Sequence, residues 1–306
     1  MQLLLARIID GLSNGATYAA IALALVLIFK ATTLINFAQG SLAMLGGFVV
    51  YVLAAEQGIP IWIALLIAML LSGVFAAGVE RTLIRPFDPA DHLPLVIITL
   101  GLLLGIDSIA GVIWRNDPRA FPSLFPEGNV FAWGTTTLRW YDLGVLVSVL
   151  VMVFLLEVLL NKTKVGLAFR AVSSNLESSR LVGIKVGQTL MFGWALAAAV
   201  GTLAATLYIS SPIRQIEPTF MLRVLIFSTA AAALGGLDSI RGALIGGLLM
   251  GLIQAFFGYL SGWSKDWAWL PDIGNELNLA TAFVVLLGVL LVRPAGLFGT
   301  KAIERV

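Results

Sequence analysis

The sequence has no cysteine, one histidine and few charged residues. Only 12% of its 306 residues are charged, whereas ordinary soluble domains have about 25%. Without cysteine, disulfides, thiolate metal sites and cysteine nucleophiles are excluded. The lone histidine, His92, follows Asp88 and Asp91 in a short turn, which is weak ground for a metal site and offers no Ser-His-Asp triad. We therefore predict no catalytic residue and no metal ligand.

Long apolar runs are what the sequence does contain, and 59% of all residues are hydrophobic. A helix rises 1.5 Å per residue, so about 20 apolar residues cross the roughly 30 Å of bilayer hydrocarbon. We predict an all-α, polytopic transmembrane helical bundle of eight or nine spans in one domain, residues 1–306. The seventh run is short, so it either joins its neighbour or forms a re-entrant segment lined by protein. The predicted helices cover residues 8–29, 40–55, 60–80, 93–114, 141–160, 188–210, 222–234, 243–261 and 279–292.

Basic residues between the runs predict the orientation, because Lys and Arg accumulate on the cytoplasmic side of a membrane. Three basic segments fall on one side if the helices alternate, which makes the carboxyl terminus cytoplasmic and the amino terminus external. The loop at 115–141, which also holds three Arg, is then external. Because these basic residues lie between apolar runs, where they set the orientation in the membrane, no nucleic-acid partner is expected. The three segments contain Lys162, Lys164, Arg170, Arg180 and Lys185, then Arg81 and Arg85, then Arg293, Lys301 and Arg305.

Glycine pairs spaced four residues apart recur in the predicted helices. This spacing puts two small residues on one helix face, where the backbones of two helices can approach closely. We interpret the pairs as sites of tight packing without further functional content. They are Gly11/Gly15, Gly101/Gly105, Gly242/Gly246 and Gly247/Gly251.

The basic loop at residues 161–187 predicts a short helix outside the membrane. Ser174 stands three residues before Glu177, the spacing of a capping box, and Gly183 is a suitable left-handed stop. A helix of about two turns is marginal alone, so it must pack on something. The loop is long for a connection between packed helices, which favours docking on another protein. The alternative is a surface helix that lies on its own bundle.

The spacing from Glu177 to Gly183 resembles the EAA-x3-G loop of bacterial ABC importer permeases, whose short coupling helix fits a groove on an ATPase subunit. Ser178 and Ser179 stand where that motif has two alanines, which slightly lowers helix propensity. Further motifs, in the same order along nearly the whole chain, are similar to those of branched-chain amino acid ABC permeases. These motifs are Ile35-Asn-Phe-Ala-Gln-Gly40, Glu80-Arg81, Arg85-Pro86, Thr163-Lys164-Val165-Gly166, Arg170-Ala171, Gly235-Gly236-Leu237, Gly242-Ala243 and Arg293-Pro294-Ala-Gly-Leu-Phe298.

The resemblance implies a type II-like permease of the bacterial inner membrane. Its partners would be a second homologous permease chain, two cytoplasmic ATPase subunits and an external solute-binding protein. No cofactor is expected on this chain, because it lacks a G-x-x-x-x-G-K-[ST] loop, so ATP and Mg would bind the partner ATPases. The resemblance assigns the coupling role to the loop at 161–187, with Arg170, Ser174, Glu177, Ser178, Arg180 and Gly183 as the contact residues.

Polar residues within the predicted spans are candidates for the translocation path, because each must face protein or water. The candidates are Thr17, Tyr18, Asn36, Gln39 and Asp107. Two alternatives stay open: Asn36 and Gln39 satisfy backbone groups at a turn, and Asp107 reaches toward the outer surface to make a contact between helices. On the external side, we expect Arg115, Arg119 and Arg214 to contact acidic edges of the solute-binding protein.

Three functions remain compatible with the sequence. The main prediction is an ABC importer permease for branched-chain or other neutral amino acids, driven by ATP through alternating access. Urea or a short amide is the alternative cargo. The rival of a different class is an ion-coupled secondary transporter or channel, in which Asp107 carries the proton or ion.

Overall fold

A computed structural model describes residues 2–87, 92–134, 136–212, 214–264 and 276–299. In this part of the chain, eleven α-helices account for most residues, and π-helical turns at Val52–Glu56 and Glu80–Ile84 extend two of them. The helices are α1 (Gln2–Thr32), α2 (Gln39–Tyr51), α3 (Ile61–Val79), α4 (His92–Trp114), α5 (Trp140–Lys162), α6 (Lys164–Ser174), α7 (Leu176–Leu181), α8 (Val186–Ile209), α9 (Phe220–Gly235), α10 (Ile240–Ser264) and α11 (Glu276–Val292).

All nine predicted apolar runs form helices, which confirms the all-α membrane fold. Within the described residues, seven helices are long and apolar enough to span a bilayer, and the apolar parts of α9 and α11 are shorter. The outer faces of α3, α4 and α5 expose large apolar side chains such as Leu66, Val112 and Phe154. Such surfaces are stable in hydrocarbon but not in water. The bundle therefore faces lipid or another membrane chain on these sides.

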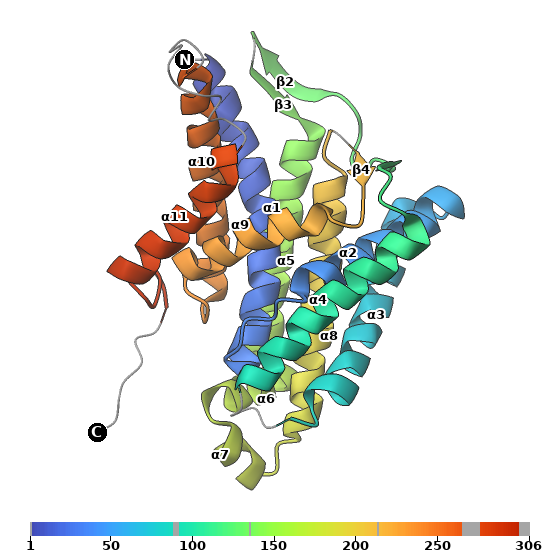
Figure 1. Ribbon diagram of the computed structural model, residues 1–306, viewed down its shortest axis with the longest axis vertical. Helices are drawn as coiled ribbons and strands as arrows, with labels where there is room; N and C mark the ends of the chain where they lie inside the picture. Colours follow the sequence, from blue (N-terminus) through green and yellow to red (C-terminus); the bar gives the residue numbers. More distant parts are fainter. Residues whose placement is uncertain (1, 88–91, 135, 213, 265–275, 300–306) are drawn as a thin grey trace.

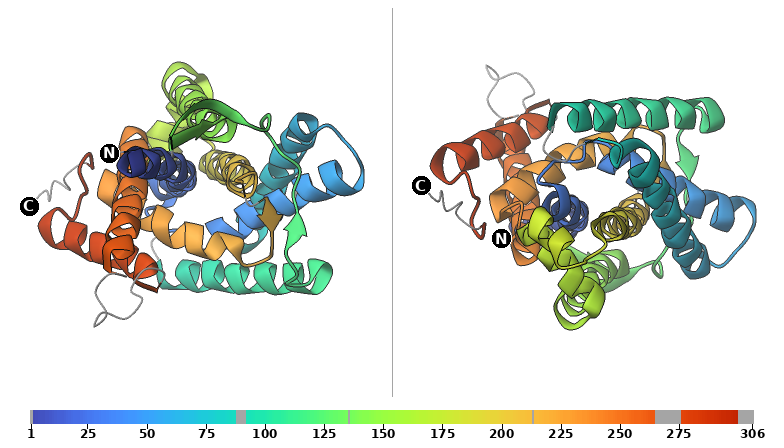
Figure 2. Two further views of the ribbon diagram at one scale, coloured as in Figure 1. Left: turned by 90° about the horizontal axis from the view of Figure 1, so that it is seen from above. Right: turned by 90° about the horizontal axis from the view of Figure 1, so that it is seen from below.

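Helices α1 and α8 occupy the middle of the bundle. Viewed from either end, α4 runs along one edge and α5 along the opposite edge, with α1 and α8 between them (Figure 2). Helix α1 contacts α5, α8, α9 and α10, and α8 contacts α2 and α3 as well. The segment from Ala19 to Ile28 is almost completely buried, so α1 is a core helix that reaches lipid mainly near its amino end.

Glycine lets α1 and α10 pack with their backbones in contact. Gly11 and Gly15 face Gly251 and Gly247, so a Cβ atom on any of the four would meet the opposite backbone or an alanine Cβ. Gly242 and Gly246 pack in the same way against α9. The packing prediction is confirmed for these three pairs. It is wrong for the pair Gly101/Gly105, because a Cβ atom on either would meet no atom of the described residues within 4 Å.

The short seventh run is a separate helix, α9, that crosses the molecule obliquely (Figure 1). A turn containing Gly236, whose φ is +108°, separates it from α10, so the expectation that it could join its neighbour is wrong. Most of its residues are buried among α1, α2, α10 and α11. A helix this short can lie at membrane depth because protein surrounds it.

Two small antiparallel pairings lie in connections where only loops were expected. Strands β2 (Asn129–Trp133) and β3 (Thr136–Arg139) form a hairpin, and β1 (Arg119–Ala120) pairs with β4 (Gln215–Ile216). The second pairing ties the loop before α5 to the loop before α9. Both pairings belong to the end of the molecule that carries the amino terminus, whereas α6 and α7 project from the opposite end (Figure 1). Lys301 and Arg305 lie outside the described residues.

The glycine contacts predict opposite effects for one substitution at two positions. Gly247→Ala should destabilise the protein by about 1–3 kcal/mol, because its Cβ atom would collide with the Ala19 backbone. Gly105→Ala should be neutral or stabilise by up to about 1 kcal/mol, because the site is open and alanine favours helix. Unfolding in detergent micelles, followed by circular dichroism, measures both changes. Equal stabilities of the two variants would contradict this packing.

Candidate functional site

A cavity of about 530 Å³ opens at the end of the bundle that carries the amino terminus. Its walls come from the first turns of α1, the junction of β3 and α5, the end of α8, the start of α9 and one residue of α10. Three arginines and three carboxylates face it, together with three tyrosines. These residues are Arg7, Arg139, Arg223, Asp10, Asp142, Glu217, Tyr18, Tyr141 and Tyr208. Cavities of this size hold small-molecule ligands in other proteins.

Arg139 organises one wall of the cavity by bridging two helices. Its Nε donates to Asp142 Oδ2 at 3.0 Å, and its Nη2 donates to Asp10 Oδ1 on α1 at 2.7 Å. Asp142 is fully buried in the first turn of α5 and also accepts the Arg139 backbone N–H. Burial lowers the pKa of Arg139, but hydrogen bonds and charge interactions with the two carboxylates raise it above its ordinary value overall. Arg139 is therefore a permanent cation that holds α1 against α5.

The inner end of the cavity is closed by a contact among three helices. The Tyr18 hydroxyl of α1 donates to Gln254 Oε1 of α10 at 2.6 Å. The Tyr18 ring stacks on Phe227 of α9, with ring centroids 5.2 Å apart. Opening the cavity toward the other end of the bundle would require these side chains to separate.

Among the predicted path residues, Tyr18 lines this cavity and Thr17 is its buried neighbour. Asn36 and Gln39 are not among the described residues that line it. Asn36 Oδ1 accepts from the Ala38 N–H at 3.1 Å, and Gln39 Nε2 donates to the Ala197 carbonyl at 3.0 Å. The Asn36 contact lies within the turn, whereas Gln39 reaches the backbone of α8, and Asn36 Nδ2 and Gln39 Oε1 make no hydrogen bond among the described residues.

Asp107 lies away from the cavity, on the peripheral helix α4. It is half-buried and interacts with the Ser41 hydroxyl of α2. The interaction joins α4 to α2, and nothing in the structure shows the Asp107 carboxylate reaching the outer surface.

Several cavity residues were not predicted as site residues. Arg139, Asp142, Glu217 and Arg223 each lie near the end of a run, where a charge normally faces lipid headgroups. Two local signals were present: the amide of Gln254 inside the run at 243–261, and the three-residue spacing of Arg139 and Asp142 at a helix start. Their convergence on α1 depends on contacts between residues far apart in the sequence.

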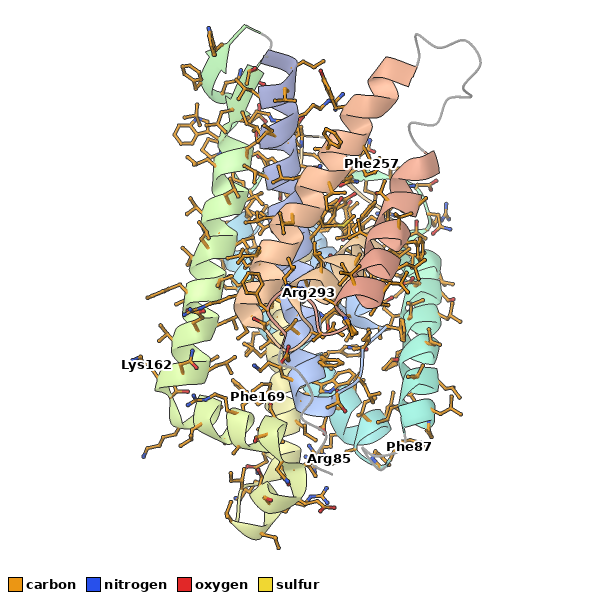
Figure 3. The ribbon with its side chains drawn as sticks, turned by 90° about the vertical axis from the view of Figure 1, so that its left-hand side faces the viewer. Arg85, Phe87, Lys162, Phe169, Phe257 and Arg293 are labelled. Carbon is orange, nitrogen blue, oxygen red and sulfur yellow. The ribbon has the colours of Figure 1, made fainter. Side chains whose placement is uncertain are left out.

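The predicted coupling loop consists of two helices, and α6 was not expected. Thr163 caps α6 by accepting the Gly166 N–H at 3.1 Å. Phe169 is buried and fits against α8 at Gly193, where a Cβ atom would approach its ring to 2.8 Å. Figure 3 shows Lys162, Phe169 and Arg85 at the same end of the molecule. Helix α6 is therefore anchored to the bundle through α8.

Helix α7 follows directly and projects from this end. The prediction that Ser174 caps it is wrong, because Ser174 is the last residue of α6 and the Asn175 side chain accepts the Ser178 N–H at 2.8 Å. The predicted stop at Gly183 is confirmed by its φ of +85°. The other predicted coupling residues, Arg170, Glu177, Ser178 and Arg180, are exposed.

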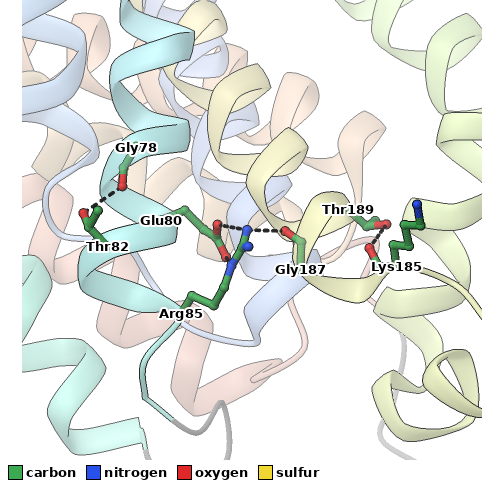
Figure 4. A network of polar contacts seen from close by, with 7 residues as sticks. All are labelled: Gly78, Glu80, Thr82, Arg85, Lys185, Gly187 and Thr189. Atoms are coloured by element: carbon green, nitrogen blue, oxygen red, sulfur yellow. Dashed lines mark hydrogen bonds and ion pairs between the residues drawn. The ribbon is translucent and has the colours of Figure 1, made fainter.

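A polar contact ties the start of α8 to the end of α3 beside the coupling segment. Arg85 Nη2 donates to Glu80 Oε2 at 2.6 Å and to the Gly187 carbonyl at 2.7 Å (Figure 4). Glu80 is only 1% exposed, so its carboxylate depends on Arg85 for compensation. Glu80, Arg85 and Gly187 line a small pocket at this end of the bundle, and Arg180 of α7 lines it as well. The first two turns of α8, here called its foot, are thus fixed by α6 on one side and by Arg85 on the other.

Helix α8 connects the coupling segment to the cavity. It runs without interruption over the 24 residues from Val186 to Ile209, about 36 Å at 1.5 Å per residue. Phe169 packs near its first turns, and Tyr208 at its far end lines the cavity. A displacement of α6 and α7 can therefore reach the cavity through one rigid element.

Two of the three arginines proposed for external docking have partners within the chain. Arg119 lies 3.9 Å from Glu56 and donates to the Trp114 carbonyl, and Arg214 donates to Glu127 at 2.7 Å. Arg115 is exposed and adopts a φ of +55°. In the part of the chain that the structure describes, no cluster of His, Asp and Glu could hold a metal ion. Asp88 and Asp91 lie outside it.

A helical membrane bundle with a charged cavity at one end and a projecting two-helix segment at the other belongs to the class of membrane permeases. The family model described as "Branched-chain amino acid transport system / permease component" matches residues 7–292, and the chain belongs to this family. The high-affinity branched-chain amino acid transport system permease protein BraD of Pseudomonas aeruginosa is 27% identical over 99% of this chain and 98% of its own. The permease protein LivH of Escherichia coli K12, described in the same words, is 28% identical over 99% and 97%.

One solved structure is also similar, that of PsaBC from Streptococcus pneumoniae in complex with Fab. It superposes with a TM-score of 0.42 at 15% identity, over 96% of this chain and 91% of that chain. This likeness is too loose to carry an argument about the site.

The ion pairs of Arg139 predict an asymmetric cost for its two partners. Arg139→Gln should destabilise the protein by about 1–3 kcal/mol, because it leaves the buried Asp142 carboxylate without its cation. Asp10→Asn should cost less than about 1 kcal/mol, because Asp10 is partly exposed. Unfolding in detergent micelles compares the two variants. A larger loss for Asp10→Asn than for Arg139→Gln would refute this description of the cavity wall.

Proposed function

We propose that the chain is the permease subunit of a binding-protein-dependent ABC importer, and that it translocates branched-chain or other neutral amino acids by ATP-driven alternating access. The observation that carries this function is the arrangement along α8, with a docking segment at one end and a cavity for a charged solute at the other. BraD and LivH, which are named as branched-chain amino acid permeases, support this cargo.

In this proposal the cavity faces the outside of the cell, and α6 and α7 face the cytoplasm across the bacterial inner membrane. The distribution of basic residues supports this orientation, because exposed Lys164, Arg170 and Arg180 gather on the coupling segment. The amino terminus is then external. The carboxyl-terminal end, beyond α11, is cytoplasmic.

The tip of α7 suits docking on an ATPase subunit. Leu181 and Val182 are 88% and 75% exposed beyond the end of the bundle, where no lipid covers them. Exposed apolar residues ringed by charges are typical of protein interfaces. Arg170, Glu177 and Arg180 would supply the polar rim. ATP and Mg would bind the two ATPase subunits, and the exposed apolar faces of the bundle would receive a second homologous permease chain.

Closure of the ATPase pair would move α7 and α6, and through Phe169 and the Arg85 contact it would move the foot of α8. The far end of α8 would then shift Tyr208 against α9 and release the inner closure at Tyr18, Phe227 and Gln254. Such a helix shift between two packed states is a common form of alternating access. The external solute-binding protein would deliver cargo to the cavity mouth, with Arg115, Arg119 and Arg214 at its contact.

The cavity favours an amino acid over urea as cargo. Six ionisable groups of both signs line it, and a zwitterion offers one charge for each sign. Urea is neutral and gains only uncharged hydrogen bonds, which are weaker than charge-assisted ones. Asp107 on peripheral α4 is not among the described residues that line the cavity, which weighs against an ion-coupled carrier.

Reconstitution tests this function directly. The chain is purified with its partner permease and ATPases, placed in liposomes with ATP, and supplied with the solute-binding protein and radiolabelled leucine or urea. We expect leucine uptake that stops without ATP. Uptake driven by an ion gradient alone, or uptake of urea in place of leucine, would refute the proposal.

Docking through α7 predicts that one charge at its tip separates the subunits. Leu181→Asp should reduce capture of the ATPase by at least about tenfold, because it puts a carboxylate into an apolar contact. Phe131→Asp is the matched control, since Phe131 is similarly exposed but lies on β2 at the other end. Co-purification in detergent measures the capture. Equal capture by both variants would show that α7 is not the docking site.

A further inference from the structure

Three charged residues that face the cavity have no ion pair among the described residues. They are Arg7, Glu217 and Arg223. The other charges of the cavity satisfy one another, since Arg139 holds both Asp10 and Asp142. The unpaired groups include both signs, so the cavity offers partners for a ligand that carries both.

One face of α9 combines a cation with apolar side chains. Phe220, Arg223, Val224 and Phe227 all line the cavity, and their spacing places them on the same side of the helix. Arg223 lies in the first turn of α9, where the helix dipole also favours an anion. Phe220, Val224 and Phe227 are buried and form the wall beneath it. A carboxylate at Arg223 would therefore leave an attached aliphatic group against an apolar wall.

Glu217 is held close to this face. Its carbonyl accepts the Phe220 N–H at 3.3 Å, which fixes the turn from β4 into α9. Glu217, Arg223 and Tyr208 all line the cavity. Glu217 and Arg223 form no ion pair with each other among the described residues, so both charges are available to a ligand.

A buried hydroxyl of α1 also lacks a partner. Ser13 lines the cavity, its residue is only 2% exposed, and its Oγ makes no hydrogen bond in the described part of the chain. Buried polar atoms are rarely left unpaired in native proteins. A ligand that enters the cavity would bring Ser13 a hydrogen-bond partner.

We propose that the cavity is a binding site for the charged end of a zwitterionic α-amino acid, with the carboxylate on Arg223, the ammonium group on Glu217, and the aliphatic side chain against Val224 and Phe227. This inference rests on the proposed function and adds the residues that would hold the cargo. Binding should be weak, because Arg223 is exposed to water. A transient site suits a permease that must release its cargo inward.

Analogues of leucine that carry only one of its two charged groups test the two proposed contacts separately. The permease–ATPase complex in lipid nanodiscs, without the solute-binding protein, is probed by saturation-transfer NMR with leucine, 4-methylpentanoate and 3-methylbutylamine. We expect leucine to bind best. Arg223→Gln should weaken 4-methylpentanoate by at least about tenfold and spare the amine, and Glu217→Gln should do the reverse, because each removes one charge-assisted contact.

Matched controls come from an exposed ion pair outside the cavity lining. Arg241→Gln and Glu157→Gln remove an arginine and a glutamate that pair with each other at 2.6 Å, and both should bind all three probes normally. If Arg223→Gln does not fold, Arg223→Lys replaces it as the test variant, and it should retain part of the affinity for the carboxylate. Binding of leucine that is unchanged in both cavity variants would overturn the inference, as would equal effects on both analogues.

Uptake assays distinguish a failed site from a failed function. Leucine import by the wild-type complex that persists undiminished in Arg223→Gln and Glu217→Gln would overturn the assigned residues and leave the proposed function intact. Import of urea but not leucine by the wild-type complex would overturn the proposed function and the inference with it. A loss of leucine import in both cavity variants, with normal ATPase capture, supports both.

Discussion

The packing of α6 against the foot of α8 is the constraint on which the proposed mechanism depends. A short segment outside the membrane cannot by itself move the walls of a cavity some 36 Å away along α8. Phe169 provides the mechanical connection because it is buried against Gly193, where even one methyl group would collide with its ring. Arg85 supports the same point from α3 through the Gly187 carbonyl. Interfaces packed this closely move as units, so a displacement of α6 has to displace α8.

The structure also accounts for the charged residues of a chain that is mostly apolar. In hydrocarbon, ionised groups survive only beside partners or water. Arg139 forms ion pairs with both Asp10 and Asp142, and Glu80 pairs with Arg85. Glycine contacts between α1 and α10 hold two helices that frame the cavity and need no charged group. The cavity charges that have no ion pair among the described residues, Arg7, Glu217 and Arg223, face the cavity.

Much of this fold could be predicted from the sequence, because the length of an apolar run decides whether it can cross a bilayer. The glycine spacing also located the contacts of Gly15 and Gly247, although Gly101 shows that spacing alone cannot say whether a neighbouring helix is present. Local competition explains the error at Ser174: α6 continues through it, and Asn175 is equally good at capping the next helix.

The cavity was harder to predict. Asp10, Arg139, Arg223 and Gln254 come from four different elements, and the three charged ones lie near the ends of apolar runs, where the sequence alone indicates an interfacial residue. Only the packing of α1 against α5, α9 and α10 brings them together. The predicted path residue Tyr18 was found because a tyrosine inside a run needs a hydrogen-bond partner, which is Gln254.

Distance measurements across the cavity test the link between the two ends most directly. Because the chain has no cysteine, spin labels can be placed at Asn14→Cys and Pro212→Cys, two exposed positions that line the cavity from α1 and from the loop after α8. In the complete complex, the distance between the labels should change when ATP binds, and Phe169→Ala should abolish that change while ATP hydrolysis continues. A change of the same size in the Phe169→Ala background would contradict transmission through α8.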